Sequence, residues 1–312
     1  MKILLAIDGS EPSKAAVKEI ARQRFPDGSE VRVVSVVETH YLSEGFAGEG
    51  TNMDLYVEIE RSGHKLAQMV VEKAAKRLGT NEYSDHLRIT TEVLSGPPKV
   101  AILEDAEVFG ADLIVIGSHG YGMVERFLLG SVSLGVAIHA KCSVRIARSP
   151  RAKRKAMKVI LATDGSRQSK AAVDETVRQI FPEGSQIQVL SVVDPPYMTG
   201  SYAWEGVDAT LYIEVERIER EQSNAAVEKA AAELRASNES EDLTVTTKVL
   251  SGSPKGLILE EAETFGADLI IVGSHGKGMV DRFLLGSVSQ SVALHASCSV
   301  EIVRVQKSGE KL

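Results

Sequence analysis

The chain has few of the residues that define several common classes of protein. Its only two cysteines, Cys142 and Cys298, occupy equivalent positions in a repeat and form neither a disulfide framework nor a metal-ligand spacing. The apolar opening run ends at Asp8, far short of a signal-peptide core or a membrane span. A net charge of −7 provides no basic surface for nucleic acid. We therefore expect a cytoplasmic protein with neither nucleic-acid nor membrane partners, and two buried cysteines that act as small hydrophobes.

The chain does contain a long internal repeat. Its 312 residues divide into two stretches, 1–156 and 157–312, that align with each other without a gap. Each stretch has the usual size of one domain, and 43% hydrophobic residues suffice for a core in each. We place domain 1 at residues 1–148, a basic, solvated linker at 149–156 and domain 2 at 157–306.

Short apolar runs alternate with helical patterns in each half. In the first half the patterns predict strands at 2–7, 30–37, 87–94, 112–116 and 143–148, and helices at 13–25, 55–78, 98–109 and 131–140. Strands joined by crossover helices favour a parallel sheet covered on both faces. The fold class is α/β: two tandem Rossmann-like domains, each a five-stranded parallel sheet with helices on both faces. Such sheets bind ligands at the carboxyl ends of their strands, where the winding reverses.

The loop after the fourth strand has the residue types that a phosphate site needs. Gly117 and Gly120 allow close backbone approach or positive φ, and Gly130-Ser131 precede a helix whose first N–H groups attract anions. The second half repeats all four residues. The Ser131 hydroxyl could donate to a phosphate or cap the helix, and His119 could touch the ligand or hold the turn.

Two familiar phosphate motifs are excluded. Lys277 is not followed by serine or threonine, so the Walker A pattern is missing, and Glu125 stands where the dinucleotide fingerprint needs its last glycine. We find no order of serine, histidine and aspartate typical of a catalytic triad. The sequence thus favours a binding protein over an enzyme.

The spacing of these glycines resembles the signature of a known family. Glycine, two residues, glycine, nine residues and glycine-serine follow a strand that begins aspartate-leucine-isoleucine, as in the nucleotide-binding motif of the universal stress proteins. The resemblance covers nearly all of both halves and identifies the chain as a tandem member of the ATP-binding branch. It implies the HUP-type version of the Rossmann-like fold, with ATP as the ligand, bound with or without Mg²⁺.

The resemblance also implies roles for individual positions. Asp8 and Asp164 would face the adenosine end, Val36 and Val192 would meet adenine through their backbone, and Ile116 and Val272 would lie near the ribose. The residues that would enclose the phosphates are Gly117, Gly120, Gly130, Ser131 and Val132, and in the second half Gly273, Gly276, Gly286, Ser287 and Val288. Ala6 and Ala162 depart from the family pattern, which often has proline there, and this departure could weaken binding.

The two halves differ inside the phosphate loop. Tyr121 in the first half corresponds to Lys277 in the second. A lysine near the phosphates would favour the more highly charged nucleotide. This difference predicts tighter triphosphate binding in the second half, unless both side chains are simply solvated.

Three functions stay open at this stage. The favoured one is an ATP-binding regulator of the stress response that acts through an unknown protein partner. The alternatives are a slow ATPase and an interaction or chaperone-like module with a vestigial pocket. The resemblance further implies that the two halves pair through their last strands as an intramolecular pseudo-dimer, which could assemble further into a homo-oligomer.

Overall fold

A computed structural model describes residues 1–38, 53–80, 86–120, 129–149, 155–194, 209–237, 242–276 and 285–305. The chain forms two compact units, Met1–Ser149 and Pro150–Leu312. Most of the linker predicted at 149–156, residues 150–154, lies outside the described ranges. Among the described helices, none combines the length and the apolar character that a membrane crossing requires.

The first unit alternates strands and helices in the predicted order. Its elements are β1 (Lys2–Ala6), α1 (Glu11–Arg22), β2 (Glu30–Val37), α2 (Met53–Gly79), β3 (Arg88–Ser95), α3 (Pro98–Phe109), β4 (Leu113–Gly117), α4 (Ser131–His139) and β5 (Ser143–Ala147). The second unit repeats them as β6 (Lys158–Ala162), α5 (Arg167–Arg178), β7 (Gln186–Val193), α6 (Ala209–Ser237), β8 (Thr244–Ser251), α7 (Pro254–Phe265), β9 (Leu269–Gly273), α8 (Ser287–His295) and β10 (Ser299–Val303).

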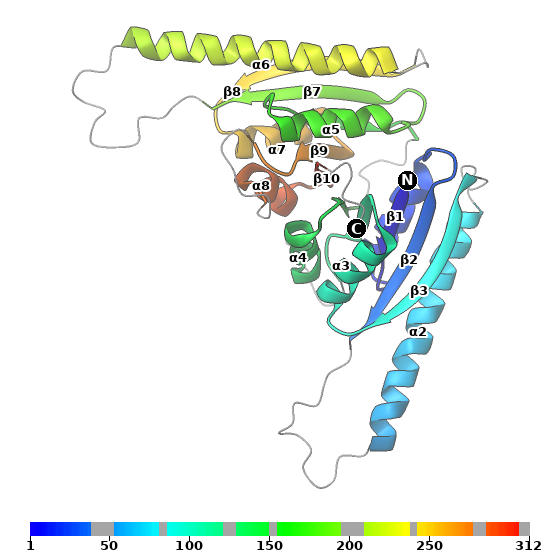
Figure 1. The fold of residues 1–312 in the computed structure, drawn as a ribbon. Helices are drawn as coiled ribbons and strands as arrows, with labels where there is room; N and C mark the ends of the chain where they lie inside the picture. The colour runs from blue at the N-terminus through cyan, green and yellow to red at the C-terminus, as the bar shows by residue number, and fades with distance from the viewer. Residues whose placement is uncertain are drawn as a thin grey trace, which may run out of the picture. The chain divides into compact units, whose positions relative to one another are not determined.

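Each unit is built on a five-stranded parallel sheet, as predicted. The strand order is β3-β2-β1-β4-β5 in the first unit and β8-β7-β6-β9-β10 in the second. In the first unit α1 and α2 cover one face and α3 and α4 the other (Figure 1). The central strands are buried on both faces, which explains why they read as continuous apolar runs. The α/β fold predicted from the sequence is confirmed.

The first helix begins and ends earlier than its sequence pattern suggested. Ser10 is the N-cap of α1 and accepts the N–H of Ser13, so Pro12 falls in the first turn, where its missing N–H costs nothing. The helix ends at Arg22 because Gln23 turns inward and accepts a hydrogen bond from Arg145 of β5. The prediction of 13–25 was therefore shifted by two or three residues.

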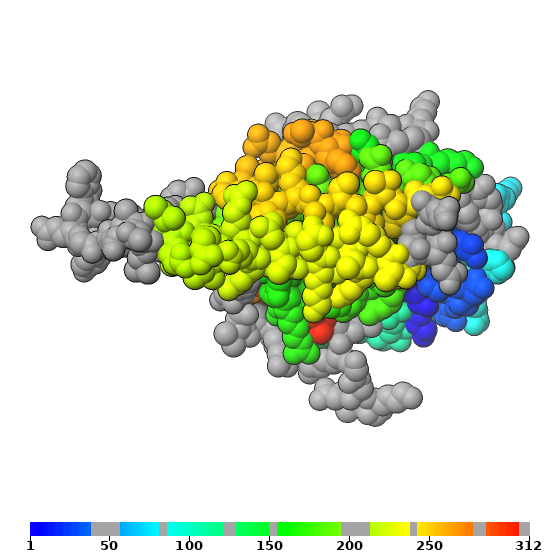
Figure 2. All heavy atoms as spheres, turned by 90° about the horizontal axis from the view of Figure 1, so that it is seen from above, coloured from blue at the N-terminus to red at the C-terminus, as the bar shows by residue number. Residues whose placement is uncertain are grey.

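The outer helix of the second unit is stabilised along its exposed side by ion pairs. Figure 2 shows α6, coloured yellow-green to yellow, at the surface of the molecule. Arg217 lies 2.6 Å from Glu214 and 2.5 Å from Glu221, three and four residues away along the helix. Such pairs support an exposed helix by a few tenths of a kcal/mol each. The apolar side of α6, with Val227, Ala231 and Leu234, packs in the core of this unit.

An equivalent helix carboxylate is paired with a cation in both units, but the cation comes from a different strand in each. In the first unit Arg32 of β2 lies 2.8 Å from Asp105 of α3 and 4.3 Å from the ring centroid of Phe109. In the second unit the position of Arg32 is Gln188, and Lys248 of β8 lies 2.7 Å from Glu261 instead. The cation has moved to the neighbouring strand.

We expect Arg32→Gln to lower the free energy of unfolding of the first unit by about 2 kcal/mol, because it removes the cation that pairs with the largely buried Asp105 carboxylate. The partial exposure of the pair keeps the loss below that of a fully buried one. Gln188→Arg is the matched control and should change stability by less than about 0.5 kcal/mol, since Glu261 already has a cation. Urea unfolding followed by circular dichroism measures both, and equal effects would contradict this account.

Candidate functional site

The crevice expected in a doubly wound sheet lies between β1 and β4 of the first unit. The chain builds β1, β2 and β3 in one direction and then returns to add β4 on the other side of β1. The winding reverses there, so the loops after these two strands diverge and leave a gap at their carboxyl ends. The second unit has the same reversal between β6 and β9.

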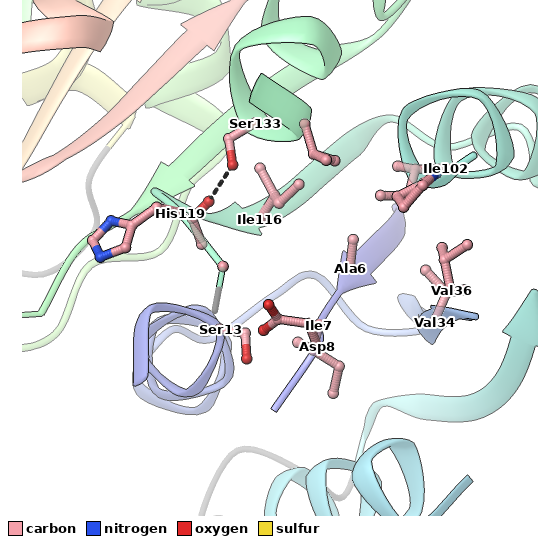
Figure 3. Close-up of a pocket in the computed structure, with 14 residues that line it drawn as sticks. Ala6, Ile7, Asp8, Ser13, Val34, Val36, Ile102, Ile116, His119 and Ser133 are labelled. Atoms are coloured by element: carbon pink, nitrogen blue, oxygen red, sulfur yellow. Dashed lines mark hydrogen bonds between the residues drawn. The ribbon is translucent and has the colours of Figure 1, made fainter. Parts of the chain in front are cut away.

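A pocket opens at this point in the first unit (Figure 3). It encloses about 160 Å³, less than the roughly 300–1,000 Å³ of typical ligand pockets, so it would take in one ring system of a larger ligand. Six residues predicted from the sequence line it: Asp8, Val36, Ile116, Gly117, Gly120 and Val132. Eight further residues line it, and of these sequence reasoning had considered only His119 and Ala6 and missed the others, among them Pro98, Ile102 and Ser133. Those three lie on α3 and α4, whose patterns are ordinary for packed helices.

The end of β2 extends past the last hydrogen bond of its ladder with β1. That bond runs from the Ile7 N–H to the Val34 carbonyl at 2.9 Å, and β1 ends at Ala6. Because backbone groups two residues apart in a strand face the same side, the N–H and C=O of Val36 point into the space beyond β1. Val192 has the same place in the second unit, where the corresponding bond joins Thr163 to Leu190 at 2.9 Å. Each unit thus presents an amide edge at its crevice.

Other atoms approach three described glycines of the loop closely, namely Gly117, Gly120 and Gly130, and none of these three has positive φ. A Cβ on Gly117 would lie 2.7 Å from the carbonyl carbon of Pro12 in the first turn of α1. A Cβ on Gly120 would lie 2.6 Å from Oδ2 of Asp8, and one on Gly130 would lie 3.1 Å from Cα of His119. Close approach therefore explains all three positions, and the nearest neighbour is backbone at Gly117 and Gly130 but a side chain at Gly120.

The first turn of α4 faces the crevice without a side-chain cap. Gly130 is the N-cap residue, and no side-chain hydrogen bond caps the helix. Ser131, the first helical residue, is exposed, so its hydroxyl does not have the capping role that the sequence left open. Ser133 donates to the carbonyl of Gly117 at 2.7 Å, a bond drawn in Figure 3, and ties the turn to the end of β4. The N–H groups of this turn lack intrahelical partners and carry partial positive charge.

The carboxylate of Asp8 is held in place by the loop that follows β1. Its Oδ1 accepts the N–H of Ser10 at 2.9 Å and the hydroxyl of Ser10 at 2.6 Å. Its Oδ2 lies against Gly120, so the loops after β1 and β4 meet at this side chain. The Asp8 carboxylate, fixed at this end of the pocket, would accept hydrogen bonds from a ligand's donor groups and would repel phosphates.

His119 holds the turn. Its Nδ1 lies 3.1 Å from the Ser118 hydroxyl, and Figure 3 shows the imidazole turned away from Ala6 and Asp8. His275 makes the same contact with Ser274 at 3.0 Å in the second unit. Of the two roles that the sequence allowed, the structure favours the structural one.

The second unit reproduces the framework of the first. Ser289 donates to the Gly273 carbonyl at 2.6 Å, and Gly286 donates to the Ser274 carbonyl at 2.8 Å. A Cβ on Gly276 would lie 2.8 Å from Oδ2 of Asp164. Val272 is the last residue but one of β9, beside this loop, and Ser287 and Val288 begin α8. All eight residues predicted for this unit are therefore placed like their counterparts.

Part of the sequence hypothesis lies outside the described residues. Tyr121 and Lys277, which predicted unequal sites, both belong to that part of the chain. Within the described ranges, histidine, cysteine, aspartate and glutamate form no group of three that could hold a metal ion.

Comparison with known proteins assigns both halves of the chain to one family. A model of the universal stress protein family matches residues 1–148 and again residues 155–304. A universal stress protein of Mycolicibacterium smegmatis is 28% identical over 306 residues, which cover 97% of this chain and 96% of that protein. One from Mycobacterium tuberculosis is 28% identical over 325 residues, with 97% and 95% covered. The crystal structure of a universal stress protein from Archaeoglobus fulgidus matches with a TM-score of 0.60 at 22% identity, over 98% of this chain and 97% of that one. The last match shows a shared fold.

Proposed function

The chain belongs to the universal stress protein family as a tandem member, and from this premise we propose that it binds one ATP in each half and acts as a nucleotide-dependent regulator. The observation that carries the proposal is the pocket between β1 and β4. It places an amide edge at Val36 opposite an uncapped helix N-terminus that begins at Gly130. The end with the amide edge suits a nucleobase, and the end at the helix N-terminus suits an anion.

The residues present fit an adenine nucleotide. The ring would lie against the apolar side chains of Val34, Ile102 and Ile116 and bond the backbone of Val36. The phosphates would lie at the first turn of α4, enclosed by Gly117, Gly120, Gly130, Ser131 and Val132. Asp8 would stay at the adenosine end, since a carboxylate beside the phosphates would repel them. Mg²⁺, if it accompanies ATP, would be held mainly by the phosphates.

The second half would bind through the equivalent set. Val192 would take adenine, Asp164 and Val272 would lie near the ribose, and Gly273, Gly276, Gly286, Ser287 and Val288 would enclose the phosphates. The support is the matching contacts of Ser289 and Gly286 with the loop after β9. The intramolecular pairing of the halves and the protein partner stay predictions.

A regulator accords better than an enzyme with the groups around the pocket. The carboxylate of Asp8 already accepts two hydrogen bonds from Ser10, and the ring of His119 is turned away, so neither is placed as a base for water. Any ATP hydrolysis in this pocket should therefore be slow. A vestigial pocket is disfavoured, because the crevice of the first unit is open and lined by the predicted residues.

Denaturing the freshly purified protein and identifying the released small molecules by mass spectrometry tests the proposal. We expect nearly two adenine nucleotides per chain, with ATP the main species. Mostly ADP would favour the slow ATPase. No nucleotide, together with no binding when ATP and magnesium are added, would contradict the proposal and favour the interaction module.

A further inference from the structure

A glycine in the second turn of α4 lies under the side chain of a lysine from α3. Gly135 is buried, and a Cβ built on it would lie 2.5 Å from Cδ and 3.1 Å from Cγ of Lys99. Glycine inside a helix is about 1 kcal/mol less favourable than alanine, so helix propensity does not explain this residue. Space explains it, because a side chain here would occupy the path of the lysine stem.

The equivalent position of the second unit has a side chain. Ser291 occupies it in α8, and the lysine is repeated as Lys255, the second residue of α7. The Cβ of a serine at this position starts where the stem of Lys99 lies in the first unit. The lysine of the second unit therefore cannot follow the same path across its helix.

The stem of Lys99 leads from the wall of the pocket toward the beginning of α4. Pro98, the residue before it, lines the pocket, as does Val132 in the first turn of α4. Because α3 and α4 follow strands of one parallel sheet, both helices begin at its carboxyl edge. Side chains of a helix lean toward its N-terminus, so the stem of Lys99 extends toward the crevice.

The ammonium of Lys99 is within reach of an anion at the first turn of α4. Ser131 lies four residues before Gly135, on the same face of the helix and about 6 Å away along its axis. Nζ is two bonds beyond Cδ, which adds about 2.5 Å, and an ion pair spans up to about 4 Å. These lengths together cover the distance to a phosphate bound beside Ser131.

We propose that Lys99 binds the phosphates of the nucleotide in the first site and that Gly135 makes room for it to do so. The inference rests on the proposed function, which puts the phosphates at the first turn of α4. None of the residues that line the described pocket is a lysine or an arginine. Lys99 supplies a full positive charge beside the partial charge of the helix N-terminus, and this makes the first site selective for the more highly charged nucleotides.

This effect is opposite in direction to the one that Tyr121 and Lys277 predict. Lys277 would favour a triphosphate in the second site, whereas Lys99 favours it in the first. The native ratio of the two affinities combines both effects. Each variant is therefore compared with the native form of its own site.

The test measures one site at a time in the full-length chain. Gly276→Val closes the second site, and calorimetry should then give one nucleotide per chain. Lys99→Gln should weaken ATP roughly three- to tenfold and AMP less, the range expected for one partly exposed contact with a charged group, and should leave adenosine unchanged. Gly135→Ser should cause the same loss in a protein at least as stable, because serine is the better helix former.

A double variant tests whether the two residues act together. Once Lys99 is glutamine, Gly135→Ser should cause no further loss of ATP affinity. The reciprocal experiment uses the second site, with the first closed by Gly120→Val. There Ser291→Gly should tighten ATP by a similar factor, and adding Lys255→Gln should remove the gain.

Two results would overturn the role of Lys99 while leaving nucleotide binding intact: an unchanged ATP affinity in Lys99→Gln, or equal losses for adenosine and ATP. A loss from Gly135→Ser that persists without Lys99 would overturn the role of the glycine. A native chain that binds neither adenosine nor ATP would instead refute the proposed function.

Discussion

Replacing Gly117 with alanine should destabilise the first unit by about 3 kcal/mol, at the upper end of the cost of overpacking a core. The added Cβ would lie 2.7 Å from the carbonyl carbon of Pro12 and 2.8 Å from the amide nitrogen of Ser13. Both atoms belong to the first turn of α1, so relief requires the helix to move away from β4. Urea unfolding followed by circular dichroism measures the loss, and Gly273→Ala should show a similar one against Gln168 in the second unit.

Gly120→Ala should reduce nucleotide affinity and leave stability almost unchanged, although Gly120 belongs to the same motif as Gly117. Its Cβ would meet only Oδ2 of Asp8, the end of a side chain that can rotate, on an exposed loop. We expect a change in stability below about 0.5 kcal/mol and a loss of nucleotide affinity at the first site of roughly tenfold, because the displaced carboxylate no longer reaches the ligand.

Gly256→Ala is the control for alanine substitution itself. Gly256 lies in α7 with no atom within 4 Å of a built Cβ, so alanine should stabilise that helix by up to about 1 kcal/mol. If Gly117→Ala keeps its stability and loses only nucleotide, the close contact with α1 is not the reason for that glycine. The division of roles within the motif would then be wrong.

Much of the fold could be predicted because its signals are local. Continuous apolar runs marked β1 and β4, and the bounds of β2 and α3 agree with the predicted ranges to the residue. The start of α1 was misplaced because Pro12 looked like a boundary, whereas the Ser10 cap placed it inside the first turn. Periodicity and turn residues determine such elements without knowledge of the tertiary structure.

The wall of the pocket could not be predicted in this way. Pro98, Ile102 and Ser133 come from helices that meet the crevice only after the sheet is assembled, and nothing in their local pattern separates them from core residues.

Ser131→Asp should separate the stability of the first unit from its function. An acidic residue in the first turn of α4 interacts favourably with the helix dipole, so the free energy of unfolding should stay level or rise by up to about 1 kcal/mol. The same carboxylate would lie where we place the phosphates. Like charges about 4 Å apart near a protein surface repel by up to about 4 kcal/mol before screening by salt. ATP affinity at the first site should therefore fall roughly a hundredfold, a loss of about 2.7 kcal/mol.

Adenosine is the decisive control for this variant, since it has no charge to repel and its affinity should not change. Ser131→Ala removes only one hydroxyl donor and should weaken ATP about fivefold. Ser287→Asp should repeat the result at the second site, with losses additive in the double variant because each acts within its own unit. Equal losses for adenosine and ATP would indicate a disturbed pocket, and an unchanged ATP affinity would place the phosphates away from α4. A loss confined to the phosphorylated ligands, in a protein at least as stable as the original, requires an anion site at the N-terminus of this helix.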